Sequence, residues 1–130
     1  MTNKVMVDTS AWIEYFRRGE GAMVELLRAA IDADAVVCCG VVLTEMLRGA
    51  FDAMERAALG RVFDALPYVE ATREDWEAAG DLLAQHRGRK IPVLDGLIAQ
   101  LCLRHDLALL SADKHFDLFK KLRRLPVRTV

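Results

Sequence analysis

Apolar positions along this 130-residue chain alternate between short β-branched runs and longer segments with helical spacing. Short runs of this kind are typical of buried strands, and apolar residues that recur every three or four positions are typical of helices. The pattern predicts strands over residues 4–7, 35–38, 67–69, 107–110 and 127–129. It predicts helices over residues 11–18, 23–33, 41–50, 51–66, 72–88 and 93–104. This alternation indicates an α/β fold, a three-layer sandwich whose mainly parallel central sheet of four to five strands has helices on both faces.

Two of the predicted helices have a recognisable start. Thr9 or Ser10 can cap the helix over residues 11–18, because a hydroxyl at that place accepts a hydrogen bond from the first turn. Thr72 is followed by Asp75 three residues later, which is the spacing of a capping box.

Two acidic residues lie on predicted helices but away from their apolar faces. Glu45 is off the face made by Val42, Leu43, Met46, Leu47 and Ala50. Asp95 is likewise off the face made by Val93, Leu94, Leu97, Ile98 and Leu101. Neither acid is therefore expected in the core of its helix packing.

Two further acids, Asp8 and Asp113, come directly after predicted strands. Ligands bind beyond the carboxyl ends of the strands in open parallel sheets, so a site is expected there. Glu45 and Asp95 can project into the same crevice and complete a group of four carboxylates. Such a group repels itself without a cation, and its hard oxygen ligands favour Mg²⁺ or Mn²⁺.

Composition indicates one globular domain over residues 1–130, with 53% hydrophobic and 28% charged residues. The apolar runs are far shorter than the roughly 20 residues that span a bilayer, and no secretory or transit signal is apparent at the amino terminus. We therefore expect no membrane association and a cytoplasmic protein. Cys38, Cys39 and Cys102 lack zinc-binding spacing and are expected to be buried, inert thiols.

The formal net charge of −1 argues against a protein that holds nucleic acid by overall charge, but it does not exclude a local basic surface. Positive charge gathers near the carboxyl terminus, where it could contact nucleic-acid phosphates or form a solvated face. Its members are Lys114, His115, Lys120, Lys121, Arg123, Arg124 and Arg128. The histidines, His86, His105 and His115, lie at polar or charged places and are not expected to be catalytic.

The sequence segments around the four acids resemble the motifs of a known protein family. The segments are VMVDTS with Asp8, TEMLRG with Glu45, LDGLIA with Asp95, and LSADKHF with Asp113. In this order they resemble the acidic motifs of PIN-domain ribonucleases, of the kind found as VapC-type toxins. The resemblance runs from about residue 4 to residue 129, and four motifs in the right order are more specific than any one of them.

The resemblance implies that Asp8 and Asp95 hold the metal and that Glu45 and Asp113 complete the catalytic pocket directly or through water. Either Glu45 or Asp113 could orient the attacking water or take its proton, and the number of ions is left open. The hydroxyls of Thr9 and Thr44 would lie nearby.

Two positions qualify this assignment. Asp117 is the spare candidate if Asp113 serves only as a helix cap. Gly96 stands where relatives often have a larger residue, and a glycine weakens a helix by up to about 1 kcal/mol.

The resemblance also implies a function and partners. It predicts an Mg²⁺- or Mn²⁺-dependent endoribonuclease that cleaves RNA and is the toxin of a type II toxin–antitoxin pair. A cognate antitoxin would inhibit it, and without the antitoxin the protein is expected to be a homodimer. Trp12, Tyr15 and Phe16 share the first helix, where they form a buried face or border the groove that receives an antitoxin segment.

Three other functions fit this sequence less well. Aspartate-nucleophile phosphatases need a second acid two residues after the first, where this chain has Ser10. Phosphoacceptor receiver domains need an acidic pair after the first strand, and Asp8 stands alone. A PIN fold that only binds RNA or an antitoxin is the third alternative, and the presence of all four acids argues against it.

Overall fold

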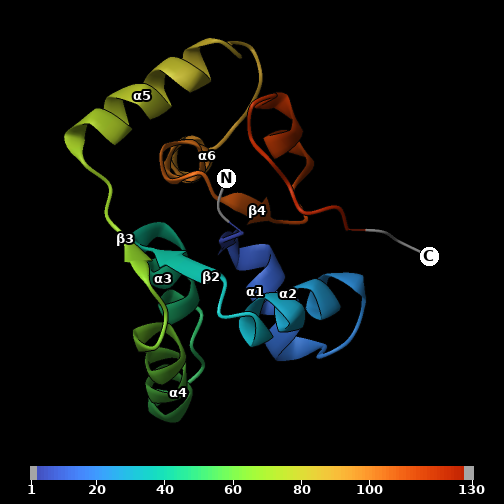
Figure 1. The fold of residues 1–130 in the computed structure, drawn as a ribbon. Coiled ribbons are helices and arrows are strands. Elements are labelled where there is room, and N and C mark those ends of the chain that lie inside the picture. The colour runs from blue at the N-terminus through green and yellow to red at the C-terminus, as the bar shows by residue number, and fades with distance from the viewer. Residues whose placement is uncertain (1–2, 128–130) are drawn as a thin grey trace.

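Four parallel strands form the centre of the computed structural model, which describes residues 3–127 (Figure 1). They are β1 (Val5–Val7), β2 (Val36–Cys39), β3 (Tyr68–Val69) and β4 (Ala108–Leu110). The sheet order is β3-β2-β1-β4, so β1 is a central strand. Val5 pairs with Val36 of β2 on one side and with Ala108 of β4 on the other. The carboxyl ends of these strands therefore meet at one edge.

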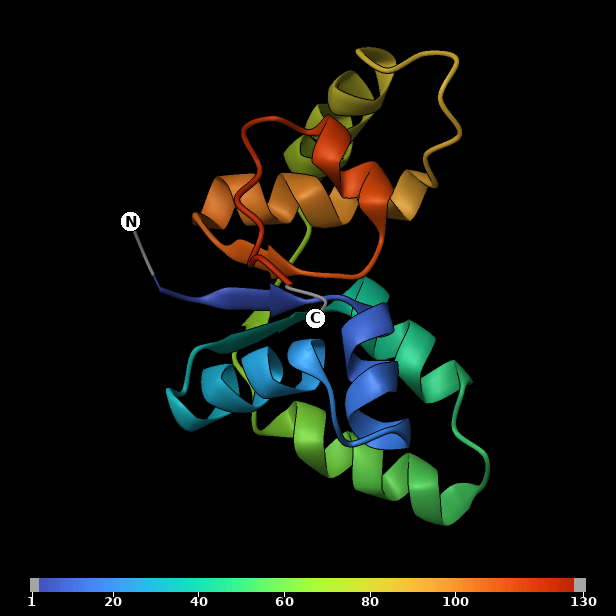
Figure 2. The ribbon, with the colours of Figure 1, turned by 90° about the vertical axis from the view of Figure 1, so that its right-hand side faces the viewer.

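Within residues 3–127, six α-helices and one 3₁₀-helix cover the sheet. They are α1 (Thr9–Arg17), α2 (Ala22–Asp32), α3 (Gly40–Arg48), α4 (Ala53–Asp64), α5 (Arg73–Ala84), α6 (Val93–His105) and η1 (Lys114–Leu118). In Figure 2, α5 and α6 lie above the strands and α1 to α4 lie below them. The expected three-layer α/β sandwich with a parallel sheet is confirmed. Within residues 3–127, no helix is long and apolar enough to cross a membrane.

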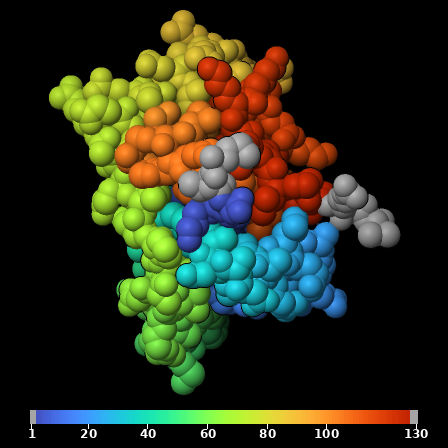
Figure 3. Space-filling view, in the orientation of Figure 1, coloured from blue at the N-terminus to red at the C-terminus, as the bar shows by residue number. Residues whose placement is uncertain are grey.

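Burial explains why the central strands are apolar throughout. Every residue of β1, β2 and β4 is buried, as expected when helices cover both faces of a parallel sheet. Trp12 and Phe116 are the bulkiest side chains that are fully buried. In Figure 3 the blue amino-terminal segment lies between α6, in orange, and residues in cyan that come after the blue segment in the chain. The three cysteines are buried free thiols, as expected.

The bounds of several predicted elements differ from the structure, and the helix predicted over residues 72–88 ends at Ala84. The helix predicted over residues 51–66 begins only at Ala53, because the Asp52 carboxylate accepts a hydrogen bond from the Glu55 backbone N–H at 2.8 Å and starts a new helix. The fifth strand was predicted over residues 127–129, of which 128 and 129 lie outside the described residues. Arg124 instead forms a single parallel bridge with Leu109 at the β4 edge.

The first turn of α6 is the place where the apolar pattern was misleading. Val93 and Leu94 were predicted on a buried face, yet they are 63% and 43% exposed. The helix is buried on several sides from Gly96 onward, whereas its first turn lines a cleft at the sheet edge. An added Cβ at Gly96 would lie 2.7 Å from Leu83 Cγ on α5, so glycine permits this close helix packing.

Asp75 joins α5 to α6 and is only 1% exposed. The predicted capping box with Thr72 is present, and Arg104 Nε donates to Asp75 Oδ1 at 2.7 Å. Burial by itself raises the pKa of Asp75, but hydrogen bonds from the Thr72 backbone and Arg104 outweigh it and lower that pKa. The carboxylate form therefore stabilises the helix pair that carries Asp95.

We expect Asp75→Ala to lower the free energy of unfolding by about 2–3 kcal/mol, because it removes a helix cap and a charge-assisted bond. Urea unfolding at neutral pH measures this. Glu77→Ala is the control on the same helix, since the Glu77–Arg73 pair is exposed and worth less than about 1 kcal/mol. Equal effects of the two substitutions would contradict the importance of this contact.

Candidate active site

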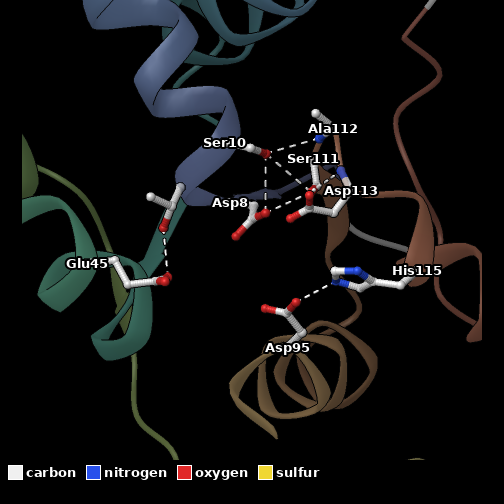
Figure 4. Close-up of polar contacts among 9 residues, drawn as sticks. Asp8, Ser10, Glu45, Asp95, Ser111, Ala112, Asp113 and His115 are labelled. Carbon is white, nitrogen blue, oxygen red and sulfur yellow. Dashed lines mark hydrogen bonds and ion pairs between the residues drawn. The ribbon is translucent and has the colours of Figure 1, made fainter. Parts of the chain in front are cut away.

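Four carboxylates meet at the carboxyl edge of the sheet (Figure 4). Asp8 follows β1, Glu45 lies on α3, Asp95 is in the first turn of α6, and Asp113 follows β4. All four line one cleft of about 460 Å³. The structure thus brings together the four acids that the sequence singles out, although they are spread over more than a hundred residues of chain.

Asp8 is the most deeply buried of the four, with 4% exposure. Ser111 Oγ donates to Asp8 Oδ2 at 2.7 Å, and Ser10 Oγ lies 3.3 Å from the same oxygen. The Asp113 backbone N–H donates to Ser111 Oγ at 3.1 Å, and that of Ala112 donates to Ser10 Oγ at 3.1 Å. The two serines therefore tie the end of β1 to the segment after β4 and orient the Asp8 carboxylate.

Capping of α1 differs from the prediction. Neither Thr9 nor Ser10 is the N-cap, because α1 already begins at Thr9 and Asp8 is the N-cap residue. The Asp8 side chain makes no capping bond. Thr9 Oγ1 instead donates to Glu45 Oε1 at 2.8 Å. Both hydroxyls thus hold acids of the cleft, and Thr44, also predicted nearby, is exposed and not among the residues that line the cleft.

Burial raises the pKa of Asp8 to about 6. The hydrogen bond from Ser111 lowers this pKa, whereas the negative charges of Asp95 and Asp113 raise it further. Burial also raises the pKa of Asp95, with contributions from Asp113 and Glu45, and contact with His115 acts in the opposite direction. Ionisation of Asp8 and Asp95 is therefore less favourable in the cleft than it would be in water.

His115 also lines this cleft, although the sequence placed it only at a charged position and indicated no catalytic role for it. Its Nε2 lies 2.5 Å from Asp95 Oδ2, and its side chain is 27% exposed. One ligand atom each from Asp95, Asp113 and His115 lie within 4.8 Å of one another. The only sequence signal for this residue is its position two residues after Asp113, since the contact with Asp95 is formed by the fold.

The chemistry of the donors fits a divalent cation. Carboxylate oxygens are the preferred ligands of Mg²⁺ and Mn²⁺. A cation among them would offset the burial, and the smaller charge repulsion, that raise the pKa values of Asp8 and Asp95. Asp117, the spare candidate, is outside the residues that line the cleft and pairs with Arg124 Nη1 at 2.6 Å. Asp113 is therefore the better placed of the two.

The basic carboxyl-terminal residues are only partly available for RNA. Arg124 also donates to the Ser111 carbonyl at 2.6 Å, and Arg123 pairs with Asp106. Lys120 and Lys121 line a separate cavity. Lys114 is exposed next to the cleft residue Asp113, and Arg128 lies outside the described residues. A role in binding RNA remains a prediction for this stretch.

Comparison with known proteins gives concordant matches. The PIN domain family model matches residues 5–122. Ribonuclease VapC11 of Mycobacterium tuberculosis is 32% identical over 127 residues, which cover 93% of this chain and 95% of the relative. The structure of VapBC-1 from nontypeable Haemophilus influenzae is similar, with a TM-score of 0.76 and 17% identity over 93% of this chain and 96% of that one. A toxin–antitoxin complex from Klebsiella pneumoniae gives 0.66 and 16%, over 85% and 87%.

We expect the raised pKa of Asp8 to make the metal-free protein less stable as pH rises. Stabilisation by the protonated carboxyl is fully present below the unfolded value near 3.8 and is lost as pH rises through about 6. Asp8→Asn mimics the protonated form, so in EDTA at pH 7.5 it should unfold with up to about 3 kcal/mol more free energy than wild type. At pH 4 the two should agree.

Thermal and urea unfolding across pH 4 to 8 measure this difference. Added Mg²⁺ should stabilise the wild type and have less effect on the variant, because a ligand that binds only the folded form raises stability. An Asp8→Asn protein that is less stable than wild type in EDTA at pH 7.5 would show that the Asp8 carboxylate is structural.

Proposed function

The chain belongs to the PIN domain family and, within it, to the VapC-type ribonucleases, and we propose that it is a metal-dependent endoribonuclease with Asp8, Glu45, Asp95 and Asp113 as its catalytic acids. This site is supported by the observation that the four carboxylates line one cleft, in which burial raises the pKa of Asp8. We treat residues 1–130 as one nuclease domain.

Hydrolysis of an RNA phosphodiester needs a nucleophilic water and relief of the charge that builds on the phosphoryl oxygens. An Mg²⁺ or Mn²⁺ ion supplies both, by lowering the pKa of a water and by offsetting negative charge. Asp8, Asp95 and Asp113 would hold the ion. The serine hydroxyls fix the Asp8 carboxylate in place before substrate binds, so little rearrangement is required.

Glu45 is the best placed acid to accept a proton from the attacking water. It lies across the cleft from His115 and Asp113 in Figure 4. Thr9 holds Oε1 of Glu45, which leaves Oε2 available to a water. Asp113 is instead grouped with Asp95 and His115, where a cation would occupy its oxygens. This division of roles supports Glu45 as general base over Asp113.

A second groove supports the toxin–antitoxin assignment. It has a volume of about 570 Å³, lies between α1, α3 and α4, and reaches Glu45 at one end. Its apolar lining includes Phe51, Phe16 and Ile13, which are 88%, 42% and 41% exposed. Such a surface fits the apolar face of an antitoxin segment. Of the aromatic residues singled out by sequence, Phe16 lines the groove, Trp12 is core, and Tyr15 packs against Trp12.

We expect the purified chain to cleave RNA with Mg²⁺ or Mn²⁺ and to stop when EDTA is added. Asp95→Asn should reduce cleavage by roughly 100-fold or more, because it removes a proposed metal ligand. Asp81→Asn, at an exposed acid on α5, is the control and should cleave as wild type does. Equal cleavage in excess EDTA would overturn the metal mechanism, and a folded wild type without any cleavage would favour the non-catalytic alternative.

The groove makes a separate prediction about the cognate antitoxin, sought as the product of a short neighbouring gene. Phe51→Asp should weaken antitoxin inhibition at least about tenfold while leaving RNA cleavage intact, because it places a charge on an apolar contact surface. Trp76→Asp, at a 46% exposed aromatic on α5, should leave inhibition unchanged. Sedimentation velocity measures the complexes and also whether the chain alone is the proposed homodimer. Unchanged inhibition of the Phe51 variant would exclude this groove.

A further inference from the structure

His115 is a nitrogen donor among the carboxylates of the cleft. It lies on η1 beside Phe116, a side chain that is 0% exposed and so anchors the turn in the core. The ring centroids of His115 and Phe116 are 4.9 Å apart. The other two histidines are not among the residues that line this cleft: His86 packs against Phe119, and His105 ends α6.

The position of Nε2 limits what this imidazole can do when a cation is present. In the structure Nε2 faces Asp95 Oδ2, and one oxygen of Asp113 lies close enough to complete a group of three within 4.8 Å. Ligands at about 2.1 Å from one ion lie within about 4 Å of each other, so a small adjustment would close these atoms around a cation. An N–H directed at that cation would be repelled, whereas the nitrogen lone pair would be attracted.

We propose that His115 Nε2 is a direct ligand of the catalytic cation, together with Asp95 and Asp113, and that it makes the site prefer Mn²⁺ to Mg²⁺. Imidazole nitrogen suits transition metals, whereas Mg²⁺ prefers oxygen ligands alone. The buried neighbour Phe116 holds the ring at the cleft, which favours ligation over movement of the ring away from the ion. This inference rests on the proposed function only in taking the cleft to be the metal site.

Loss of affinity cannot by itself separate a ligand from a residue that merely positions Asp95. Removing a hydrogen-bond partner of a metal ligand also weakens metal binding by roughly 10- to 100-fold. Electron spin echo modulation of bound Mn²⁺ separates the two roles, because it detects a ¹⁴N nucleus bonded to the ion. The full chain is titrated with Mn²⁺ alone, without RNA.

The wild type should give ¹⁴N modulation, and His86→Gln, the control at a histidine outside the cleft, should give the same signal. His115→Gln should still bind Mn²⁺ through carboxylates but lose the modulation, with Mn²⁺ affinity falling roughly tenfold or more. Its Mg²⁺ affinity should change much less, because the amide oxygen suits Mg²⁺. Calorimetric titration gives both affinities.

A second measurement needs no substitution and protects the test against a variant that fails to fold. Wild-type chain with ¹⁵N in its three histidines should replace the ¹⁴N pattern with ¹⁵N coupling. Bound Mn²⁺ without nitrogen coupling, or coupling that persists in folded His115→Gln, would overturn the proposal while leaving RNA cleavage and the carboxylate site in place. Nitrogen-coupled Mn²⁺ in a protein that cuts no RNA would sink the proposed function instead. Absence of Mn²⁺ binding would overturn both.

Discussion

The carboxylate of Asp8 is placed at the end of the central strand with almost no exposure to water, and the rest of the site is arranged around it. Burial of a charge is costly unless partners compensate, and here Ser10 and Ser111 supply hydroxyls while Asp95 and Asp113 supply more negative charge. The serines orient the carboxylate, but they cannot neutralise it. A bound divalent cation would do so. The same cation would therefore stabilise this edge of the sheet and supply the proposed hydrolytic chemistry.

The opposite wall of the cleft depends on the packing of α6. Its position is set by close approach to α5 at Gly96 and by the Asp75–Arg104 contact, and none of these three residues lines the cleft itself. The buried segment from Gly96 onward leaves the first turn of α6 projecting past the sheet, with Asp95 directed at Asp8 and His115. Residues outside the cleft lining thus help to determine the separation of the acids, and a shift of α6 would change the geometry of the whole group.

Much of the fold could be predicted from sequence because its signals are local. Buried strands gave continuous apolar runs, and the Thr72 capping box was readable directly. Asp8 and Asp113 followed strands, and Asp95 lay off an apolar face, so their meeting was predictable from parallel topology. The exposure of Val93 and Leu94 was not predictable, because the periodicity of apolar residues cannot distinguish a buried face from the wall of a cleft.

The partners of the acids were also beyond the reach of local patterns. Ser111 contacts Asp8 across a separation of 103 residues, and His115 contacts Asp95 across 20. The local sequence allows Thr9 to cap the first helix, but in the tertiary fold its hydroxyl donates a hydrogen bond to Glu45. Short polar side chains form whichever hydrogen bond the fold brings near, so their roles follow from tertiary structure.

Anomalous scattering from crystals grown with Mn²⁺ would reveal whether the acid cluster is a cation site. We expect an anomalous peak in the cleft, bounded by carboxylate oxygens of Asp8, Asp95 and Asp113. An empty cleft in crystals of a protein that cleaves RNA in the same Mn²⁺ solution would contradict it.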